Sequence, residues 1–182
     1  DLDGDGIPWR TLPGTPHPRA AYFTRGSGHN ENAAYSEKPH HYVANVDRLA
    51  RKEETARSLV PRPVLEDRAS ATAGLLAFGT SHYGTAEARD RLERDHGLPL
   101  DYLRLRALPL APEAKEWIAR HEVVYVVEQN RDAQLATLLR DEAPGLASRL
   151  VSVLQYDGLP LDATTVVEGV LSHRARAAGG AR

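Results

Sequence analysis

From residue 74 onward, short apolar runs alternate with charged, amphipathic segments, and this alternation constrains the fold more than any other feature. Strand-like runs rich in Val and Leu cover residues 74–79, 101–105, 123–127 and 150–154, and helical spacing of apolar residues marks 85–96, 112–121, 132–142 and 163–172. Strands that are apolar throughout are buried on both faces, and parallel strands need a crossover between them. We therefore predict an α/β fold with a doubly wound, mostly parallel sheet covered by helices on both faces.

The first part of the chain lacks this alternation of strands and helices. Five prolines and glycines interrupt residues 8–18, and proline disfavours regular helix there. Residues 20–23 could form one strand, and residues 42–59 have the apolar spacing of a helix, which Pro61 and Pro63 end. The predicted organisation is an irregular segment with one helix (1–62), a linker (63–71), the α/β domain (72–172) and a disordered tail (173–182).

Composition narrows the possible classes of protein. The 182 residues carry a formal net charge of −2, contain no cysteine, and include no apolar run of the length that a membrane-spanning helix needs. A nearly neutral chain has no general electrostatic attraction for nucleic acid or anionic lipid. We expect a soluble, cytoplasmic protein with no nucleic-acid or membrane partner. Because the chain also lacks methionine, we expect it to be a piece of a longer polypeptide.

Two sequence patterns typical of metal-binding sites are incomplete. Asp1, Asp3, Asp5 and Gly6 match the first half of a calcium-binding EF-hand loop, but Leu12 stands where the loop needs a bidentate Glu. The histidines at 17, 29, 40 and 41 do not form a metal-binding HExxH motif. We expect a tight acidic turn, surface histidines and no metal site.

A glycine-rich turn follows the first predicted strand of the sheet. Residues 79–84 are close to the nucleophile elbow of serine hydrolases, but Gly84 is one position too late. The simplest interpretation is a strand-to-helix turn in which Thr80 or Ser81 caps the helix. Alternatively, the backbone N–H groups of this turn could bind an anion or a polar ligand.

A second polar cluster follows the most apolar strand, at residues 128–134. Ligands of doubly wound sheets collect at the carboxyl ends of strands where the strand order reverses. We therefore expect a cofactor-binding cluster of polar residues at this edge, formed by Thr80, Ser81, His82, Glu128, Asn130 and Gln134. The alternative is structural: Asn130 or Asp132 caps the next helix, and Glu128 pairs with an arginine across a subunit contact.

Five segments, taken in order, resemble the alpha subunit of 2-oxoacid:ferredoxin oxidoreductases, most closely the 2-oxoglutarate type. The opening segment comprises residues 3–15 and 22–31, and the others are 78–82 (Phe78-Gly79-Thr80-Ser81-His82), 102–109, 126–135 and 156–160. The resemblance covers residues 1–171. It implies that residues 1–62 end a pyrimidine-binding domain for thiamine diphosphate, and that residues 72–172 resemble the transketolase C-terminal domain.

In this family the holoenzyme uses thiamine diphosphate, magnesium, an iron–sulfur cluster and coenzyme A. It decarboxylates a 2-oxoacid, passes two electrons to ferredoxin and delivers the acyl group to coenzyme A. The beta subunit holds the magnesium and the cluster. The family segments that activate thiamine and contact the 2-oxoacid have no counterpart here. The resemblance therefore implies no catalytic residue, no cofactor bound by this chain alone, and a role in subunit assembly and in scaffolding the cofactor cleft.

Under this hypothesis, the polar residues Arg10, Thr11, Arg25, His29 and Glu31 hold the first segment against a domain that is missing from the chain. Two further hypotheses remain open. One is a free-standing flavodoxin-like domain that binds a nucleotide or coenzyme A at the turn of residues 79–84. The other is a non-catalytic interaction module.

Overall fold

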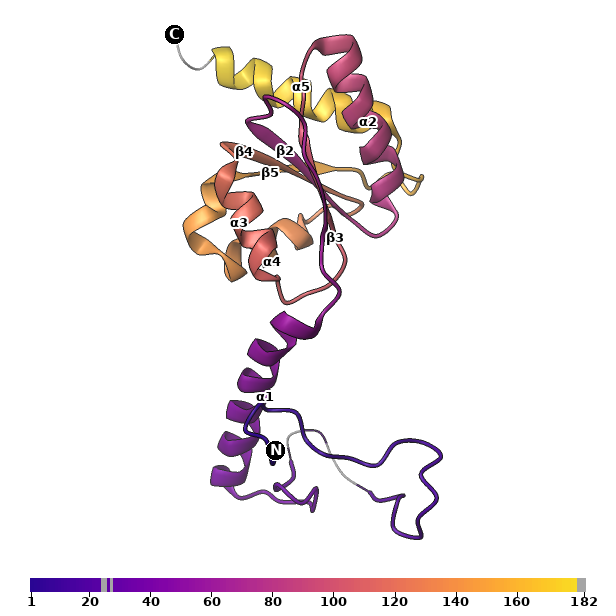
Figure 1. Ribbon diagram of the computed structural model, residues 1–182, viewed down its shortest axis with the longest axis vertical. Helices are drawn as coiled ribbons and strands as arrows, with labels where there is room; N and C mark the ends of the chain where they lie inside the picture. The colour runs from indigo at the N-terminus through magenta and orange to yellow at the C-terminus, as the bar shows by residue number, and fades with distance from the viewer. Residues whose placement is uncertain (24–25, 27, 180–182) are drawn as a thin grey trace. The chain divides into compact units, whose positions relative to one another are not determined.

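The computed structural model describes residues 1–23, 26 and 28–179, and it divides into two compact units, Asp1–Leu59 and Val60–Arg182 (Figure 1). Each unit is described by itself. Among the described residues, none of the helices combines the length and the apolar character needed to cross a bilayer.

The second unit contains a five-stranded sheet in the order β1-β3-β2-β4-β5. The strands are β1 (Val64–Glu66), β2 (Ala73–Phe78), β3 (Asp101–Leu105), β4 (Val123–Glu128) and β5 (Leu150–Leu154). The neighbours β3, β2, β4 and β5 are parallel, and only the edge strand β1 is antiparallel, to β3. The predicted α/β class with a mostly parallel sheet is confirmed.

Helices cover both faces of this sheet (Figure 1). The helical segments are α2 (Ser81–His96), α3 (Pro112–Arg120), α4 (Gln134–Glu142), the 3₁₀ segment η1 (Pro144–Arg149) and α5 (Ala163–Gly179). Leu92 of α2 and Val166 of α5 belong to one apolar cluster, and Trp117 of α3 and Leu139 of α4 belong to the other. Because the strands bury side chains on both faces, they are apolar without alternation.

Three predictions about local structure are wrong. Residues 64–66, expected in a linker, form β1, because the open edge of β3 offers them hydrogen-bonding partners. Residues 173–179, expected in a disordered tail, continue α5, and their Ala and Arg content favours a helix. Residues 20–23 do not form a strand.

In the first unit, α1 (Pro39–Leu59) supports an otherwise irregular segment. The acidic turn closes on itself: Asp1 Oδ1 accepts a hydrogen bond from the Gly6 nitrogen at 3.1 Å, and Asp5 Oδ1 accepts one from the Ile7 nitrogen at 2.8 Å. A Cβ atom on Gly6 would lie 2.2 Å from the backbone nitrogen of Lys52, so the turn packs directly on the helix backbone. The turn agrees with the structural interpretation of the calcium-like motif.

Candidate functional site

A cavity lies at the carboxyl ends of the central strands, where the order of the strands reverses. Strand β2 has β3 on one side and β4 on the other, so the connections that leave β2 and β4 cover opposite faces of the sheet. This is where ligands of open α/β sheets bind. The cavity has a volume of about 530 Å³ and is lined by Phe78, Gly79, Thr80, Ser81, Leu105, Leu108, Glu128, Gln129, Asn130, Gln134, Leu135 and Leu138.

The structure brings together five of the six residues in the predicted binding cluster. Thr80 and Ser81 come from the turn after β2, Glu128 and Asn130 from the end of β4 and the loop after it, and Gln134 from the first position of α4. The prediction of convergence is therefore correct for these five residues. Their role in binding stays a prediction.

His82 lies apart from this cavity. Its Nδ1 atom is 2.7 Å from the hydroxyl oxygen of Tyr102, and the two rings are stacked. Burial, with a smaller contribution from the Arg104 guanidinium, lowers the pKa of His82 below its usual value. Burial also raises the pKa of Tyr102 to about 12, so its hydroxyl keeps a proton that it can donate to a neutral His82.

Gln129 connects the two turns that form the cavity. Its Nε2 atom lies 3.3 Å from both Thr80 Oγ1 and Ser81 Oγ, and so bridges the chain segments after β2 and β4. A second hollow, of about 510 Å³, shares Thr80 and Gln129 with the first and is otherwise lined by Tyr83 and residues 158–161. Sequence reasoning did not select Gln129, although its position directly after a buried strand is the same signal that selected Glu128.

The Glu128 carboxylate is buried and is used within the chain. Its Oε2 atom accepts hydrogen bonds from Leu135 N at 2.8 Å and from Asn130 Nδ2 at 2.5 Å, and its Oε1 atom accepts one from Ala136 N at 3.1 Å. The side chain thus satisfies two backbone N–H groups at the start of α4, where negative charge is favourable. Its partners in the structure lie within the chain, and the alternative of an arginine partner in another subunit stays a prediction.

Asn130 has a related structural role. Its Oδ1 atom accepts hydrogen bonds from Asp132 N and Gln134 N, each at 3.1 Å. Asn130 thus satisfies the backbone N–H group of Gln134, the first residue of α4, as the capping alternative expected, although Ala133 occupies the N-cap position. The amino end of α4 is occupied by groups of the chain itself.

The described residues that line the cavity include few groups that could act in catalysis. Among the described residues that line it there is no Lys, Arg or His, and the Ser81 hydroxyl contacts an amide rather than a histidine. A serine nucleophile needs an adjacent base, so the arrangement does not support serine hydrolysis. Leu105, Leu108, Phe78 and Leu138 make the wall largely apolar.

In the first unit, three of the residues expected to contact a missing domain, Arg10, His29 and Glu31, line one cavity of about 390 Å³. Arg10 and Glu31 are exposed, and the Thr11 hydroxyl donates to the carbonyl oxygen of Ala20 at 2.8 Å. His29 lies beside the buried Asn45, with 3.2 Å between Nε2 and Nδ2. Arg25 lies outside the described residues.

Comparison with known proteins gives an informative similarity to a solved structure. No family model matches this sequence, and no curated protein matches it. Among solved structures, the chain is similar to the 2-oxoglutarate:ferredoxin oxidoreductase from Magnetococcus marinus, solved with 2-oxoglutarate, coenzyme A and succinyl-CoA bound. The TM-score is 0.72 at 23% identity, and the similarity covers 92% of this chain.

The likeness shows a shared fold. This chain spans 29% of the length of that oxidoreductase chain. The family suggested by the five sequence segments and the protein found by its structure are of the same kind, so the predicted resemblance is confirmed at the level of the fold.

Proposed function

We propose that this chain is the C-terminal portion of the alpha subunit of a cytoplasmic, thiamine-diphosphate-dependent 2-oxoglutarate:ferredoxin oxidoreductase. Its role in that enzyme is to assemble with the beta subunit and to support the cofactor cleft. The observation that carries this proposal is the structural similarity over 92% of the chain to an enzyme of that name. The ordered sequence segments, which were selected from the residues alone, support the same assignment.

The chemistry of the cavity supports a scaffolding role. Glu128 and Asn130, the most obvious polar candidates, hold the start of α4. Gln129 ties together the two turns through Thr80 and Ser81. These contacts hold the turns after β2 and β4 in place. They give the domain a well-defined edge against which another polypeptide can pack.

The residues around the cavity at the strand-order reversal do not fit the charged cofactors of the holoenzyme. The described residues contain no group of three or more His, Asp or Glu side chains placed to hold a metal ion, so they offer no site for the magnesium. The sequence has no cysteine, so the ligands of the iron–sulfur cluster must come from elsewhere. The described wall of this cavity also lacks a cationic side chain for the diphosphate of thiamine diphosphate or of coenzyme A. We therefore assign no step of the reaction to this chain.

The decisive experiment is an activity assay on two preparations. The isolated 182-residue chain should not reduce ferredoxin with 2-oxoglutarate and coenzyme A. The complex purified from its native cells through an affinity tag on this chain should do so, and the activity should require both coenzyme A and 2-oxoglutarate. Turnover by the isolated chain, or a tagged complex without this activity, would contradict the proposal.

The cavity at the strand-order reversal keeps a second candidate open, a flavodoxin-like domain that binds a nucleotide or coenzyme A by itself. The absence of a cationic residue among the described residues of its wall speaks against a phosphorylated ligand. Thermal unfolding of the isolated chain with nucleotides and with coenzyme A tests it. A ligand at 100 times its Kd should stabilise the chain by about 2.7 kcal/mol. A rise in Tm with one of these ligands would favour this candidate over scaffolding alone.

A further inference from the structure

The two edges of the sheet differ in how well they are protected against pairing with another strand. At one edge, β1 is three residues long, follows Pro63 and carries Glu66, which pairs with Arg89. Short length, proline and charge are common ways of protecting an edge strand. At the other edge, β5 runs over the five residues Leu150–Leu154 and contains no charged residue, glycine or proline. The β5 edge is therefore the less protected of the two.

The hydrogen bonding of β5 shows which of its backbone groups point away from the sheet. Among the strands that the structure describes, its one neighbour is β4. Gln155 N donates to Glu128 O at 3.2 Å, so every second residue of β5, counted back from Gln155, turns its backbone groups toward β4. The N–H and C=O groups of Ser152 and Leu154 therefore point outward, as does the C=O group of Leu150.

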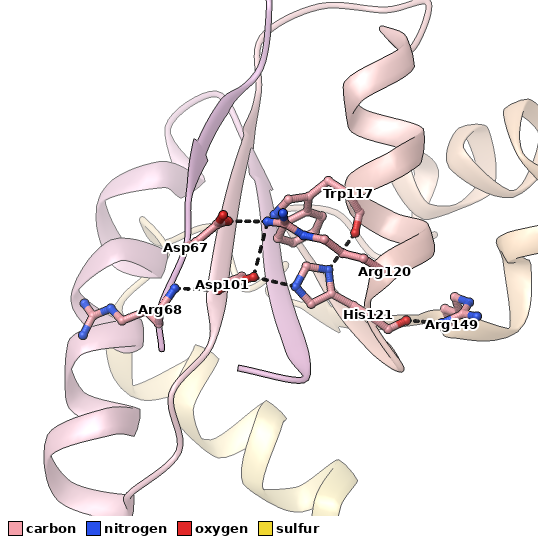
Figure 2. Close-up of polar contacts among 7 residues, drawn as sticks. All are labelled: Asp67, Arg68, Asp101, Trp117, Arg120, His121 and Arg149. Atoms are coloured by element: carbon pink, nitrogen blue, oxygen red, sulfur yellow. Dashed lines mark hydrogen bonds and ion pairs between the residues drawn. The ribbon is translucent and has the colours of Figure 1, made fainter. Parts of the chain in front are cut away.

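Two arginines near the start of β5 are held within the chain. Arg149, which directly precedes the strand, donates a hydrogen bond to the backbone carbonyl of His121 (Figure 2). Arg140 of α4 donates one to the carbonyl oxygen of Leu150 at 3.2 Å, and that oxygen has a second lone pair. Neither contact uses the backbone groups of Ser152. The centre of the strand thus keeps a donor and an acceptor directed at the open edge.

The sequence of β5 is a palindrome, Leu-Val-Ser-Val-Leu, with Ser152 at its centre. When two such strands pair antiparallel around this centre, serine lies opposite serine, each valine opposite a valine and each leucine opposite a leucine. Because the N–H and C=O groups of Ser152 point outward, the two serines form a pair that exchanges both hydrogen bonds. The strand is therefore complementary to itself, as a two-fold interface between identical chains requires.

Charge favours the antiparallel orientation over the parallel one. The guanidinium groups of Arg140 and Arg149 lie near the amino end of β5, whereas the exposed Asp157 lies in the turn after its carboxyl end. Antiparallel pairing places the positive end of each strand beside the acidic turn of the other copy, and parallel pairing would place like charges together. An antiparallel pair is also closed, because it uses the open edge of both copies.

We propose that β5 is the contact between two copies of this chain, whose β5 strands pair antiparallel around Ser152 and join two five-stranded sheets into one. The outward backbone groups of Ser152 then bond to the same groups of the identical strand. This pairing uses the edge of the second unit and does not depend on the proposed oxidoreductase role.

A single introduced cysteine reports on this register, because the chain has no cysteine of its own. Residues opposite each other in a hydrogen-bonded antiparallel pair have Cα atoms about 5.5 Å apart, a separation that a disulfide spans. Ser152→Cys should therefore form a disulfide between two chains under mild oxidation. Ser70→Cys is the matched control: this exposed serine lies between β1 and β2, and the variant should remain a single chain on a non-reducing gel.

Ser152→Pro separates the two copies without disturbing the sheet of either. Proline removes the outward N–H group of residue 152, and proline is tolerated on an edge strand where the N–H group faces away from the sheet. The variant should keep the circular dichroism spectrum of the unaltered chain and should have the mass of one chain.

The experiment measures the mass of the 182-residue chain and of these variants by light scattering after gel filtration, over a dilution series. We expect twice the mass of one chain for the unaltered protein, falling to that of one chain on dilution. A chain that is monomeric at every concentration would overturn the proposal, as would a dimer that Ser152→Cys does not cross-link or a folded Ser152→Pro variant that still dimerises. If Ser152→Pro does not fold, the mass of the unaltered chain and the Ser152→Cys cross-link decide.

Discussion

The Oε2 atom of Glu128 lies 2.8 Å from the backbone nitrogen of Leu135, so the last residue of β4 supports the start of α4. A carboxylate in this position satisfies N–H groups that a helix cannot satisfy itself, and it complements the helix dipole. The same contact fills the position that an anionic ligand would need. The local stability of this edge of the sheet therefore depends in part on this side chain.

Glu128→Gln should destabilise the second unit. The glutamine amide keeps one oxygen acceptor but places an NH₂ group toward a backbone donor, so one buried N–H group loses its partner. The expected loss is about 1–3 kcal/mol in the free energy of unfolding, measured with urea. Asp132→Asn is the control, because the Asp132 side chain is exposed and, among the described residues, its carboxylate pairs with the neighbouring Arg131, so the change should have little effect. A Glu128→Gln variant as stable as this control would show that the capping contact is not needed.

The helices and long strands of the second unit were predictable because each is marked by a pattern of apolar residues within its own segment. Apolar runs and helical spacing identified β2 to β5 and all four α-helices that cover the sheet, with errors mainly at their ends. Strand β1 was missed because three residues between Pro63 and Asp67 are too short to show a pattern, and their strand geometry comes from pairing with β3. Its existence depends on a partner that lies about forty residues away in the sequence.

The candidate site was predictable in position but not in detail. The carboxyl ends of neighbouring parallel strands meet at one edge, which placed Ser81 and Glu128 together correctly. His82 follows Ser81 directly, but successive residues at the start of a helix point in different directions, and its ring contacts Tyr102 instead. The sequence did not reveal the capping role of Glu128, because the residues whose N–H groups it accepts, Leu135 and Ala136, follow it by seven and eight positions. This spacing lies outside the usual capping motifs.

Gly74→Ala should destabilise the sheet through a collision with the core. A Cβ atom at this position of β2 would lie 2.3 Å from Cη2 of Trp117, which is 1% exposed. Overpacking of this kind costs about 1–3 kcal/mol, measured as a change in the free energy of unfolding. Gly145→Ala is the control, since a Cβ atom there would have no neighbour within 4 Å.

Trp117→Phe should partly rescue Gly74→Ala. The smaller ring removes the atoms that meet the new methyl group, and among the described residues the Trp117 Nε1 atom has no hydrogen-bond partner to lose. The double variant should be more stable than the sum of the two single losses by about 0.5–3 kcal/mol. Additive losses in this double-mutant cycle would show that the collision is relieved elsewhere, for example by a shift of α3.

The titration of His82 should reflect its burial. Its pKa is lowered by burial first and by Arg104 second, so its NMR titration midpoint should fall below the value of about 6.5 for an ordinary histidine. Arg104→Gln should raise this midpoint by removing the nearby positive charge. A midpoint at or above the ordinary value, or one insensitive to Arg104→Gln, would contradict the assignment.

The same lowered pKa predicts a loss of stability in acid. Below about pH 6.5 the unfolded chain binds a proton at this position more readily than the folded chain, so the free energy of unfolding should decrease as the pH falls. The contribution should be small because the ring is only partly buried. Urea unfolding of His82→Gln should show a weaker dependence on pH in this range than the unaltered chain.

The α/β unit should fold without the first unit, and the place of the cut should matter. A chain of residues 60–182 keeps β1, which pairs with β3, together with the Arg68 amide that donates to Asp101 and the Glu66 carboxylate that pairs with Arg89. It should unfold in one cooperative transition. A chain of residues 72–182 loses these contacts and should have a lower Tm, by an amount that corresponds to roughly 1 kcal/mol for each buried hydrogen bond lost. Equal Tm values for the two chains would show that β1 adds nothing to the sheet, and failure of residues 60–182 to fold would show that the two units form one cooperative structure.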